Sequence, residues 1–411
     1  MVQESQASAA AVVSTGATEA VPEISRPRTI DPRIRGRMPA LDGVRGLAIL
    51  MVLFVHFFAD TMATNPFERV LTRVTGFGTY GVDLFFMLSG FLITGILVDS
   101  KGGNGYFRNF YMRRALRIFP LYYGILIAVI LVAPLVVSSP DLEVLRSRQA
   151  WAWLYGINIY SALRGEFSFP YIDHCWSLAV EEHFYFFWPL VVWLCSTTTL
   201  LRVCIGLALA SLIGRMIAVT LGVNLLALDV LTPFRFDGLC TGAAFAVYAR
   251  QAGGLDALAR VTRRLAIGGA VVFALSHVAS TIRPDLFGPM RQLRASLFTI
   301  FMGHMMIAAL RSGPGGWLSR LFGPKLQFLG TYSYGLYVFH HLISYYYFKH
   351  QTEFILGRWI GSHTAAVFLQ AIVGMVVSLG IAIASYHLFE KRFLALKRRW
   401  EEPAGARLHA R

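Results

Sequence analysis

Charged residues are scarce in this sequence, and no long hydrophilic block separates its apolar runs. Asp, Glu, Lys and Arg make up 15% of the 411 residues, whereas hydrophobic residues make up 55%, and the mean hydropathy is +0.54. A soluble globular chain carries about 25% charged residues. The composition therefore excludes a soluble protein and predicts one continuous polytopic membrane domain.

Cysteine is also rare, and its spacing fits neither a metal site nor a disulfide framework. The four cysteines are Cys175, Cys195, Cys204 and Cys240, and none of them forms a CxxC pair. This spacing supports neither bound zinc nor a set of disulfides. We therefore expect packing roles for the four thiols, no metal ion and no tightly bound cofactor.

The first 37 residues lack an apolar run long enough for a signal sequence. Their longest apolar run, residues 9–13, is shorter than the apolar region of a secretory signal. The segment is rich in Ala, Ser, Val and Pro and ends in five arginines, which is typical of a disordered cytosolic tail. We expect the membrane domain to cover residues 38–395 and a basic cytosolic tail to follow at 396–411.

Apolar segments of about 20 residues recur along the chain and predict an all-α transmembrane bundle of about ten spans. Lys and Arg concentrate in alternate loops, which places both termini in the cytoplasm. This topology also explains the formal charge of +15, so no nucleic-acid partner is expected. A re-entrant segment near 151–159 is an alternative that would change the count. The predicted spans lie near 43–63, 78–98, 116–138, 176–195, 201–222, 235–250, 264–281, 293–311, 329–348 and 364–388.

One apolar run, residues 41–58 (LDGVRGLAILMVLFVHFF), carries Arg45 near its start and His56 deep inside. In a helix that rises about 1.5 Å per residue, these two lie about 16 Å apart along the axis and within about 20° of the same face. An ionisable group at that depth needs a partner or water, so it is a functional candidate by default. The alternative is a packing histidine that donates to a backbone carbonyl.

Two further segments offer small residues and arginines. Residues 80–94 (YGVDLFFMLSGFLIT) place Asp83 near one end of a span, and Ser89 and Gly90 in the middle suit either close helix packing or a ligand contact.

Residues 106–123 (YFRNFYMRRALRIFPLYY) carry a basic cluster at the cytoplasmic boundary. Such a cluster most often binds anionic lipid or sets topology. The alternative is a site for a phosphate-rich cytosolic ligand, because guanidinium groups match phosphate oxygens. The arginines of this cluster are Arg108, Arg113, Arg114 and Arg117.

Carboxylates are embedded in residues 174–189 (HCWSLAVEEHFYFFWP), an apolar and aromatic segment. Glu181 and Glu182 need pairing, protonation or water there. Adjacent side chains on a helix point about 100° apart, so we expect only one of the two to face a site. For that one, pairing with an arginine and a functional role are both open.

For the other polar side chains of the predicted spans, a structural role is the simplest interpretation. In residues 233–242 (PFRFDGLCTG), Arg235 and Asp237 stand at a helix start, where an ion pair with each other or with Asp83 is the simplest expectation. A lone histidine or glutamate near the last two spans is more often a packing residue than a catalyst. These residues are His340, His341, His387 and Glu390.

Together these motifs resemble those of acyltransferase family 3, integral membrane proteins of the polysaccharide O-acetylase type. The resemblance runs in order from about residue 38 to residue 395. Members with these motifs move an acyl group, commonly acetyl, from cytosolic acyl-coenzyme A to a hydroxyl of an extracytoplasmic or membrane-associated glycan or lipid. The resemblance therefore implies an enzyme of a bacterial inner membrane.

The resemblance also implies site residues. The family's arginine, ten intervening residues and histidine match Arg45 and His56, and its Trp-Ser-Leu-Glu region includes Trp176 and Glu181. His56 would be the general base, with a transient acyl-imidazole less favoured, and Arg45 and Glu181 would complete the catalytic group. The expected donor-binding residues are Arg45, Ser89, Arg113, Arg114 and Arg117, and the expected acceptor-binding residues are Asp83, Trp176, Arg235 and Asp237.

Other functions remain open from the sequence alone. Polar groups at this depth also build transporters and proton relays, and pairs of membrane histidines can ligate haem. Some members of the family carry an appended extracytoplasmic esterase-like domain, which these residues do not match. A separate extracytoplasmic partner is therefore an expectation, alongside membrane lipids.

Overall fold

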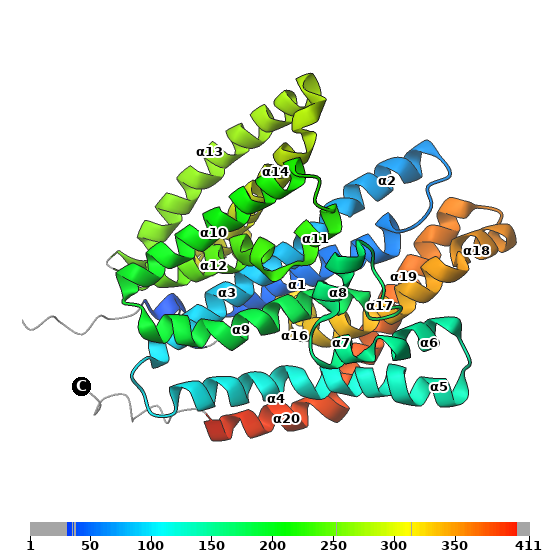
Figure 1. Cartoon of the computed structure of the whole chain (residues 1–411), viewed down its shortest axis with the longest axis horizontal. Coiled ribbons are helices and arrows are strands. Elements are labelled where there is room, and N and C mark those ends of the chain that lie inside the picture. The colour runs from blue at the N-terminus through cyan, green and yellow to red at the C-terminus, as the bar shows by residue number, and fades with distance from the viewer. Residues whose placement is uncertain (1–30, 35, 37, 252, 314, 401–411) are drawn as a thin grey trace, which may run out of the picture. The chain divides into compact units, whose positions relative to one another are not determined.

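The computed structural model describes residues 31–34, 36, 38–251, 253–313 and 315–400, which form helices and connecting loops with no strand (Figure 1). The all-α prediction is thereby confirmed. Most of the two predicted tails lies outside the described residues. Within the first of them, Pro32–Ile34 form a short 3-10 helix, η1.

Seven helical segments within the described residues are long and apolar enough to cross a membrane, so the fold is that of a polytopic membrane protein. The other three predicted spans form the helices α9, α12 and α17. The helix α12 has only 13 residues, whereas α9 and α17 have 19 and 18 residues and carry polar side chains. The count of about ten spans therefore stays a prediction, as does the side on which the termini lie. The seven segments are Pro39–Ala59, Pro66–Ser100, Tyr106–Val136, Thr197–Thr220, Gly254–Ile282, Pro284–Arg311 and His363–Leu396.

Two central helices hold the bundle together. Figure 1 shows α1 and α3 in the middle of the bundle, with α12 on one side and α9 and α16 on the other. The contacts agree, because α1 packs against α3, α16 and α17, and α3 packs against α9 and α12. The long helices are α1 (Pro39–Phe54), α3 (Tyr80–Ser100), α4 (Tyr106–Leu126), α9 (Trp176–Leu194), α10 (Thr197–Thr220), α12 (Phe236–Tyr248), α13 (Gly254–Ile282), α14 (Phe287–Arg311), α17 (Ser333–His350) and α19 (His363–Ser385).

Shorter helices connect and extend the long ones. Three segments are π-helical and continue an α-helix, namely η2 (Val55–Ala59), η4 (Ile127–Val132) and η8 (Tyr386–Glu390). The 3-10 segments besides η1 are η3 (Phe77–Thr79), η5 (Asp173–Cys175), η6 (Thr232–Arg235), η7 (Pro284–Leu286) and η9 (Lys397–Trp400). The short α-helices are α2 (Pro66–Gly76), α5 (Ala133–Val136), α6 (Pro140–Ser147), α7 (Gln149–Trp153), α8 (Ile157–Arg164), α11 (Leu225–Val230), α15 (Trp317–Leu321), α16 (Pro324–Thr331), α18 (Thr352–Ile360) and α20 (Lys391–Leu396).

Glycines set the close approach of α3 and α12. A Cβ atom added at Gly90 would lie 1.8 Å from the Leu239 carbonyl oxygen, and one added at Gly242 would lie 2.0 Å from that of Met87. Only glycine allows two backbones to pack this closely. Of the two interpretations open for Ser89 and Gly90, close packing therefore holds for Gly90.

A buried ion pair ties three helices together. Arg215 on α10 is 1% exposed and forms an ion pair with Asp237 on α12. Both side chains bind Ser296 on α14, which lies 2.7 Å from Arg215 Nη2 and donates to Asp237 Oδ2 at 2.7 Å. Asp237 thus does not pair with Arg235, its neighbour in the sequence motif. It joins helices of the bundle instead of facing a cavity.

Candidate functional site

Two cavities lie back to back in the bundle. The Arg45 cavity has a volume of about 110 Å³, and its polar lining residues are Arg45, Ser89, Arg114, Arg117, Ser177, Glu181, Tyr185, Ser333, Tyr334 and Tyr337. The His56 cavity has a volume of about 610 Å³, and its lining includes His56, Asp60, Asp83, Asp173, His174, Trp176, Asp229, Arg235, Arg291 and His341. Val82 and Tyr337 line both cavities. These two side chains therefore form the wall between them.

The Arg45 cavity is cationic. Its charged lining residues, among those described, are three arginines and one glutamate. Arg45 Nη1 donates to Asp42 Oδ1 at 3.0 Å, and the Arg114 guanidinium lies 5.6 Å from the centre of the Tyr185 ring. The excess of guanidinium groups favours an anionic ligand.

A hydrogen-bonded group fixes the carboxylate of this cavity. The Tyr185 hydroxyl donates to Glu181 Oε2 at 3.0 Å and is also in contact with the Ser89 hydroxyl. Glu182, the adjacent carboxylate, does not line the cavity, and its Oε1 is buried without a hydrogen-bond partner among the described residues. As the helical geometry predicts, only one of the two glutamates faces a cavity.

The neighbouring arginines of α4 separate into two groups. Arg114 and Arg117 line the Arg45 cavity, but Arg113 points elsewhere, and its Nε donates to the Asn109 carbonyl oxygen at 3.1 Å. The sequence motif grouped all three because they are close in sequence. Adjacent side chains on a helix point about 100° apart, and here Arg113 and Arg114 extend in different directions.

His56 lies on the π-helical segment η2, which continues α1. Such segments are rare and often occur at functional sites. Its Nδ1 lies 2.9 Å from Asp60 Oδ2, and the side chain is 24% exposed. When Asp60 accepts the Nδ1 proton, the lone pair is on Nε2, which is the tautomer that a base or a metal ligand needs.

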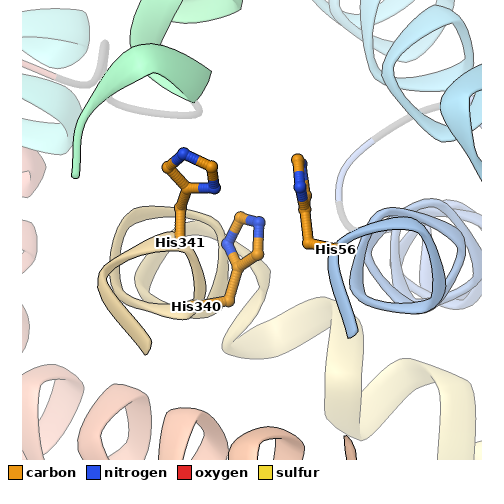
Figure 2. A group of neighbouring side chains, drawn as sticks. All are labelled: His56, His340 and His341. Atoms are coloured by element: carbon orange, nitrogen blue, oxygen red, sulfur yellow. The ribbon is translucent and has the colours of Figure 1, made fainter. Parts of the chain in front are cut away.

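Three more histidines surround His56. Its ring centre lies 5.1 Å from that of His340 and 4.9 Å from that of His341 (Figure 2). The centre of the His174 ring lies 4.8 Å from that of His341. His340 is fully buried, and its Nδ1 lies 2.8 Å from the Tyr337 carbonyl oxygen. The sequence suggested packing roles for His340 and His341 as lone histidines, but in the structure they are not isolated, because both lie beside His56.

The other end of the His56 cavity holds paired charges and aromatic rings. Arg235 forms an ion pair with Asp83, one of the two partners that the sequence offered, and Arg291 Nη2 lies 3.3 Å from Asp229 Oδ2. Trp176 is among the aromatic lining residues. Burial raises the pKa of Asp173 to about 6. The lining therefore offers many hydrogen-bonding groups and aromatic faces.

Most of the site residues proposed from the sequence fall into two groups, one in each cavity. Arg45, Ser89, Arg114, Arg117 and Glu181 share one cavity, and His56, Asp83, Trp176 and Arg235 share the other. The proposed catalytic residues are thus on two sides of the Val82–Tyr337 wall. Other residues lie outside both cavities, and these are Arg113, Asp237, His387 and Glu390.

Comparisons with known proteins agree with the motifs. The family model of acyltransferase family 3, described as an acyltransferase domain, matches residues 38–387. The peptidoglycan O-acetyltransferase OatA of Listeria monocytogenes is 28% identical over 324 residues, which are 75% of this chain and 50% of OatA. The putative peptidoglycan O-acetyltransferase YrhL of Bacillus subtilis is 26% identical over 371 residues, which are 86% of this chain and 54% of YrhL.

A putative O-acetyltransferase of Staphylococcus aureus is 32% identical over 162 residues, which are 38% of this chain and 24% of that protein. The chain spans about half the length of OatA and YrhL. No solved structure matches it.

Proposed function

Because this chain belongs to acyltransferase family 3, we propose that it transfers an acyl group, specifically acetyl, from cytosolic acyl-coenzyme A to a hydroxyl of an extracytoplasmic glycan. Two of its relatives are named as peptidoglycan O-acetyltransferases, one of them putatively, which supports a cell-wall glycan as the acceptor. The observation that carries the proposal is the pair of adjoining cavities, one lined by arginines and one containing His56.

The donor binds at the Arg45 cavity. Coenzyme A carries several phosphate charges at one end and a long, thin pantetheine arm with the thioester at the other. Arg45, Arg114 and Arg117 supply guanidinium groups that match phosphate oxygens. A volume of about 110 Å³ holds a thin arm but not the whole coenzyme, so the nucleotide end remains at the cavity mouth.

The thioester reaches the His56 cavity between Val82 and Tyr337. The Tyr337 hydroxyl donates to the His174 carbonyl oxygen at 2.7 Å and lies 2.6 Å from the Ser177 hydroxyl, so its position is fixed by η5 and the start of α9. In the predicted topology, α1 runs outward from the cytoplasm. The donor then enters from the cytosolic face and the acceptor from the opposite one.

His56 is the general base of the transfer. The acceptor oxygen attacks the thioester carbonyl carbon while His56 Nε2 takes the hydroxyl proton. The carbon–sulfur bond then breaks, and the imidazolium returns the proton to the leaving thiolate. The products are an O-acyl ester and the free thiol of coenzyme A. Asp60 orients the ring and stabilises the imidazolium through Nδ1.

The His56 cavity receives the acceptor. In the pairs Arg235–Asp83 and Arg291–Asp229, each positive charge is offset by a negative one, and the side chains can still form hydrogen bonds. Trp176 offers an aromatic face. Such a lining suits a sugar with several hydroxyl groups. Its volume of about 610 Å³ lies in the range of about 300–1,000 Å³ that ligand pockets usually have.

The test is transfer in proteoliposomes that contain the purified protein, acetyl-coenzyme A labelled in its acetyl group and a soluble peptidoglycan fragment. We expect labelled, base-labile ester on the fragment, detected by mass spectrometry. No ester, together with counterflow of the labelled fragment across the membrane, would reject the enzyme and support a transporter.

A further inference from the structure

The histidines around His56 have free nitrogen atoms that the acyl transfer does not use. His340 Nε2 and His341 Nε2 are buried and have no hydrogen-bond partner among the described residues, and the same holds for His174 Nδ1. A buried ring nitrogen without a hydrogen-bond partner can offer its lone pair to a metal ion.

Three of these rings converge on one point. His56, His340 and His341 each offer a ligand nitrogen, and these nitrogens all lie within 4.8 Å of one another. Figure 2 shows His340 and His341 extending from α17 into the space beside the ring of His56, which lies on η2. We propose that these three histidines bind a divalent transition-metal ion of the Zn²⁺ class, with an open coordination position toward the His56 cavity.

The donor set selects the kind of ion. Neutral imidazole suits zinc, copper, nickel and iron, whereas Mg²⁺ and Ca²⁺ need oxygen ligands, which none of these three side chains supplies. Three protein ligands with one open position are typical of zinc sites that bind an exchangeable ligand.

The surroundings fix the tautomers that such a site needs. A histidine ligand usually donates its other ring N–H to a carboxylate or a backbone carbonyl. Asp60 accepts from His56 Nδ1 at 2.9 Å, and the Tyr337 carbonyl accepts from His340 Nδ1 at 2.8 Å. Nε2 of both rings is then free to bind the ion. The Ser344 hydroxyl lies 3.4 Å from His341 Nδ1 and offers the third ring a weaker partner.

Binding requires a small inward movement. Two nitrogens at about 2.0–2.1 Å from a tetrahedral ion lie about 3.4 Å apart, which is less than the 4.8 Å limit seen here. Rotation of the half-exposed His56 and His341 side chains brings the nitrogens closer. A bound ion takes the Nε2 lone pair that the proposed base uses, so metal binding and acyl transfer compete at His56.

The test uses the full chain, purified without a polyhistidine tag and treated with a chelator, and Co²⁺ as the probe. We expect one Co²⁺ per chain, with the visible absorption of a tetrahedral nitrogen-ligated ion. In His341→Gln and in His56→Gln the affinity should fall at least tenfold. The control His277→Gln, an exposed position on α13, should bind as the unchanged protein does. Two different ligand variants are used so that a folding defect in one leaves the other informative.

Absence of the tetrahedral spectrum would overturn the proposal, and so would equal affinity in both ligand variants and the control. A second measurement addresses His56 itself. Zn²⁺ should inhibit labelled acetyl transfer in the concentration range in which it displaces Co²⁺, and chelator should restore the activity. Full activity with the site loaded would overturn the role of His56 as a ligand. Because Co²⁺ binding is measured without acyl transfer, its failure leaves the proposed function standing.

Discussion

The Arg45 cavity and the His56 cavity share a wall but differ in charge. Among the described lining residues, the first has three arginines and one glutamate, whereas the second has two arginines and four aspartates. In the second, two of the aspartates are paired with arginines and Asp60 binds His56. The comparison supports our proposal that the anionic donor binds in the cationic Arg45 cavity and that the acceptor binds in the His56 cavity, where two arginine–aspartate pairs offset part of the charge.

The largest expected effect separates chemistry from donor binding. In His56→Gln we expect the rate of acetyl transfer to fall about 100- to 10,000-fold, because general-base catalysis contributes that much. The affinity for acetyl-coenzyme A should stay the same, because His56 lies beyond the wall from the Arg45 cavity. Rates are measured in proteoliposomes, and affinity by calorimetry on the same preparation. A His56→Gln protein with normal turnover would refute the role of the base.

A second prediction compares ion pairs in the bundle interior with those at the surface. In Asp237→Ala the buried Arg215 loses its charged partner, which should lower the free energy of unfolding by about 3–5 kcal/mol. The control is Asp285→Ala, whose pair with Arg283 is fully exposed, so that its loss should lower the free energy of unfolding far less. Unfolding is followed in detergent. Similar losses in both variants would show that Asp237 has no special structural role.

The third prediction tests which arginines bind the donor. In Arg114→Gln we expect the affinity for acetyl-coenzyme A to fall about 10- to 100-fold, since a hydrogen bond to a charged group contributes about 1.5–3 kcal/mol. Arg113→Gln is the matched control, because Arg113 is adjacent in sequence but lies outside the cavity. Equal losses in the two variants would assign the cluster to general electrostatic attraction.

The last prediction concerns the orientation of His56. In Asp60→Asn the carboxylate that holds the ring is replaced, and we expect the transfer rate to fall about 10- to 100-fold, as for other residues that orient a functional histidine. The loss should be in kcat, with KM for acetyl-coenzyme A unchanged. A change in KM alone would instead place Asp60 in substrate binding.

The sequence predicted most of the helices, for a physical reason. A membrane helix needs a long apolar segment, and such segments are visible in the sequence. All ten predicted spans are helical, although three of them are not both long and apolar enough to cross a membrane. Helical periodicity predicted Arg45 and His56 on one face, but the structure places them in two cavities, with His56 on the π-helical segment η2. Periodicity also indicated that only one of Glu181 and Glu182 would face a cavity, as the structure has it. These are local properties of one helix.

What could not be predicted depends on contacts between distant segments. His56 and His340 are 284 positions apart, and no periodicity relates α1 to α17, so the histidine cluster appears only in the folded bundle. The expectation of no metal rested on cysteine spacing, which carries no information about such a cluster. Likewise, Asp237 could pair with Arg215 only once α10 and α12 had packed together. The adjacent histidines at positions 340 and 341 were the one feature of the sequence that pointed to a histidine cluster.

The most direct test of the account is to map where the acyl group lies when the donor is bound. An acyl-coenzyme A with a photoreactive group on its acyl chain should label peptides that contain Val82, Tyr337 or His56, and excess coenzyme A should prevent the labelling. Arg114→Gln should weaken it, and Arg113→Gln should not. Labelling confined to a peripheral helix such as α13, with none beside His56, would contradict the claim that the donor crosses the wall between the two cavities.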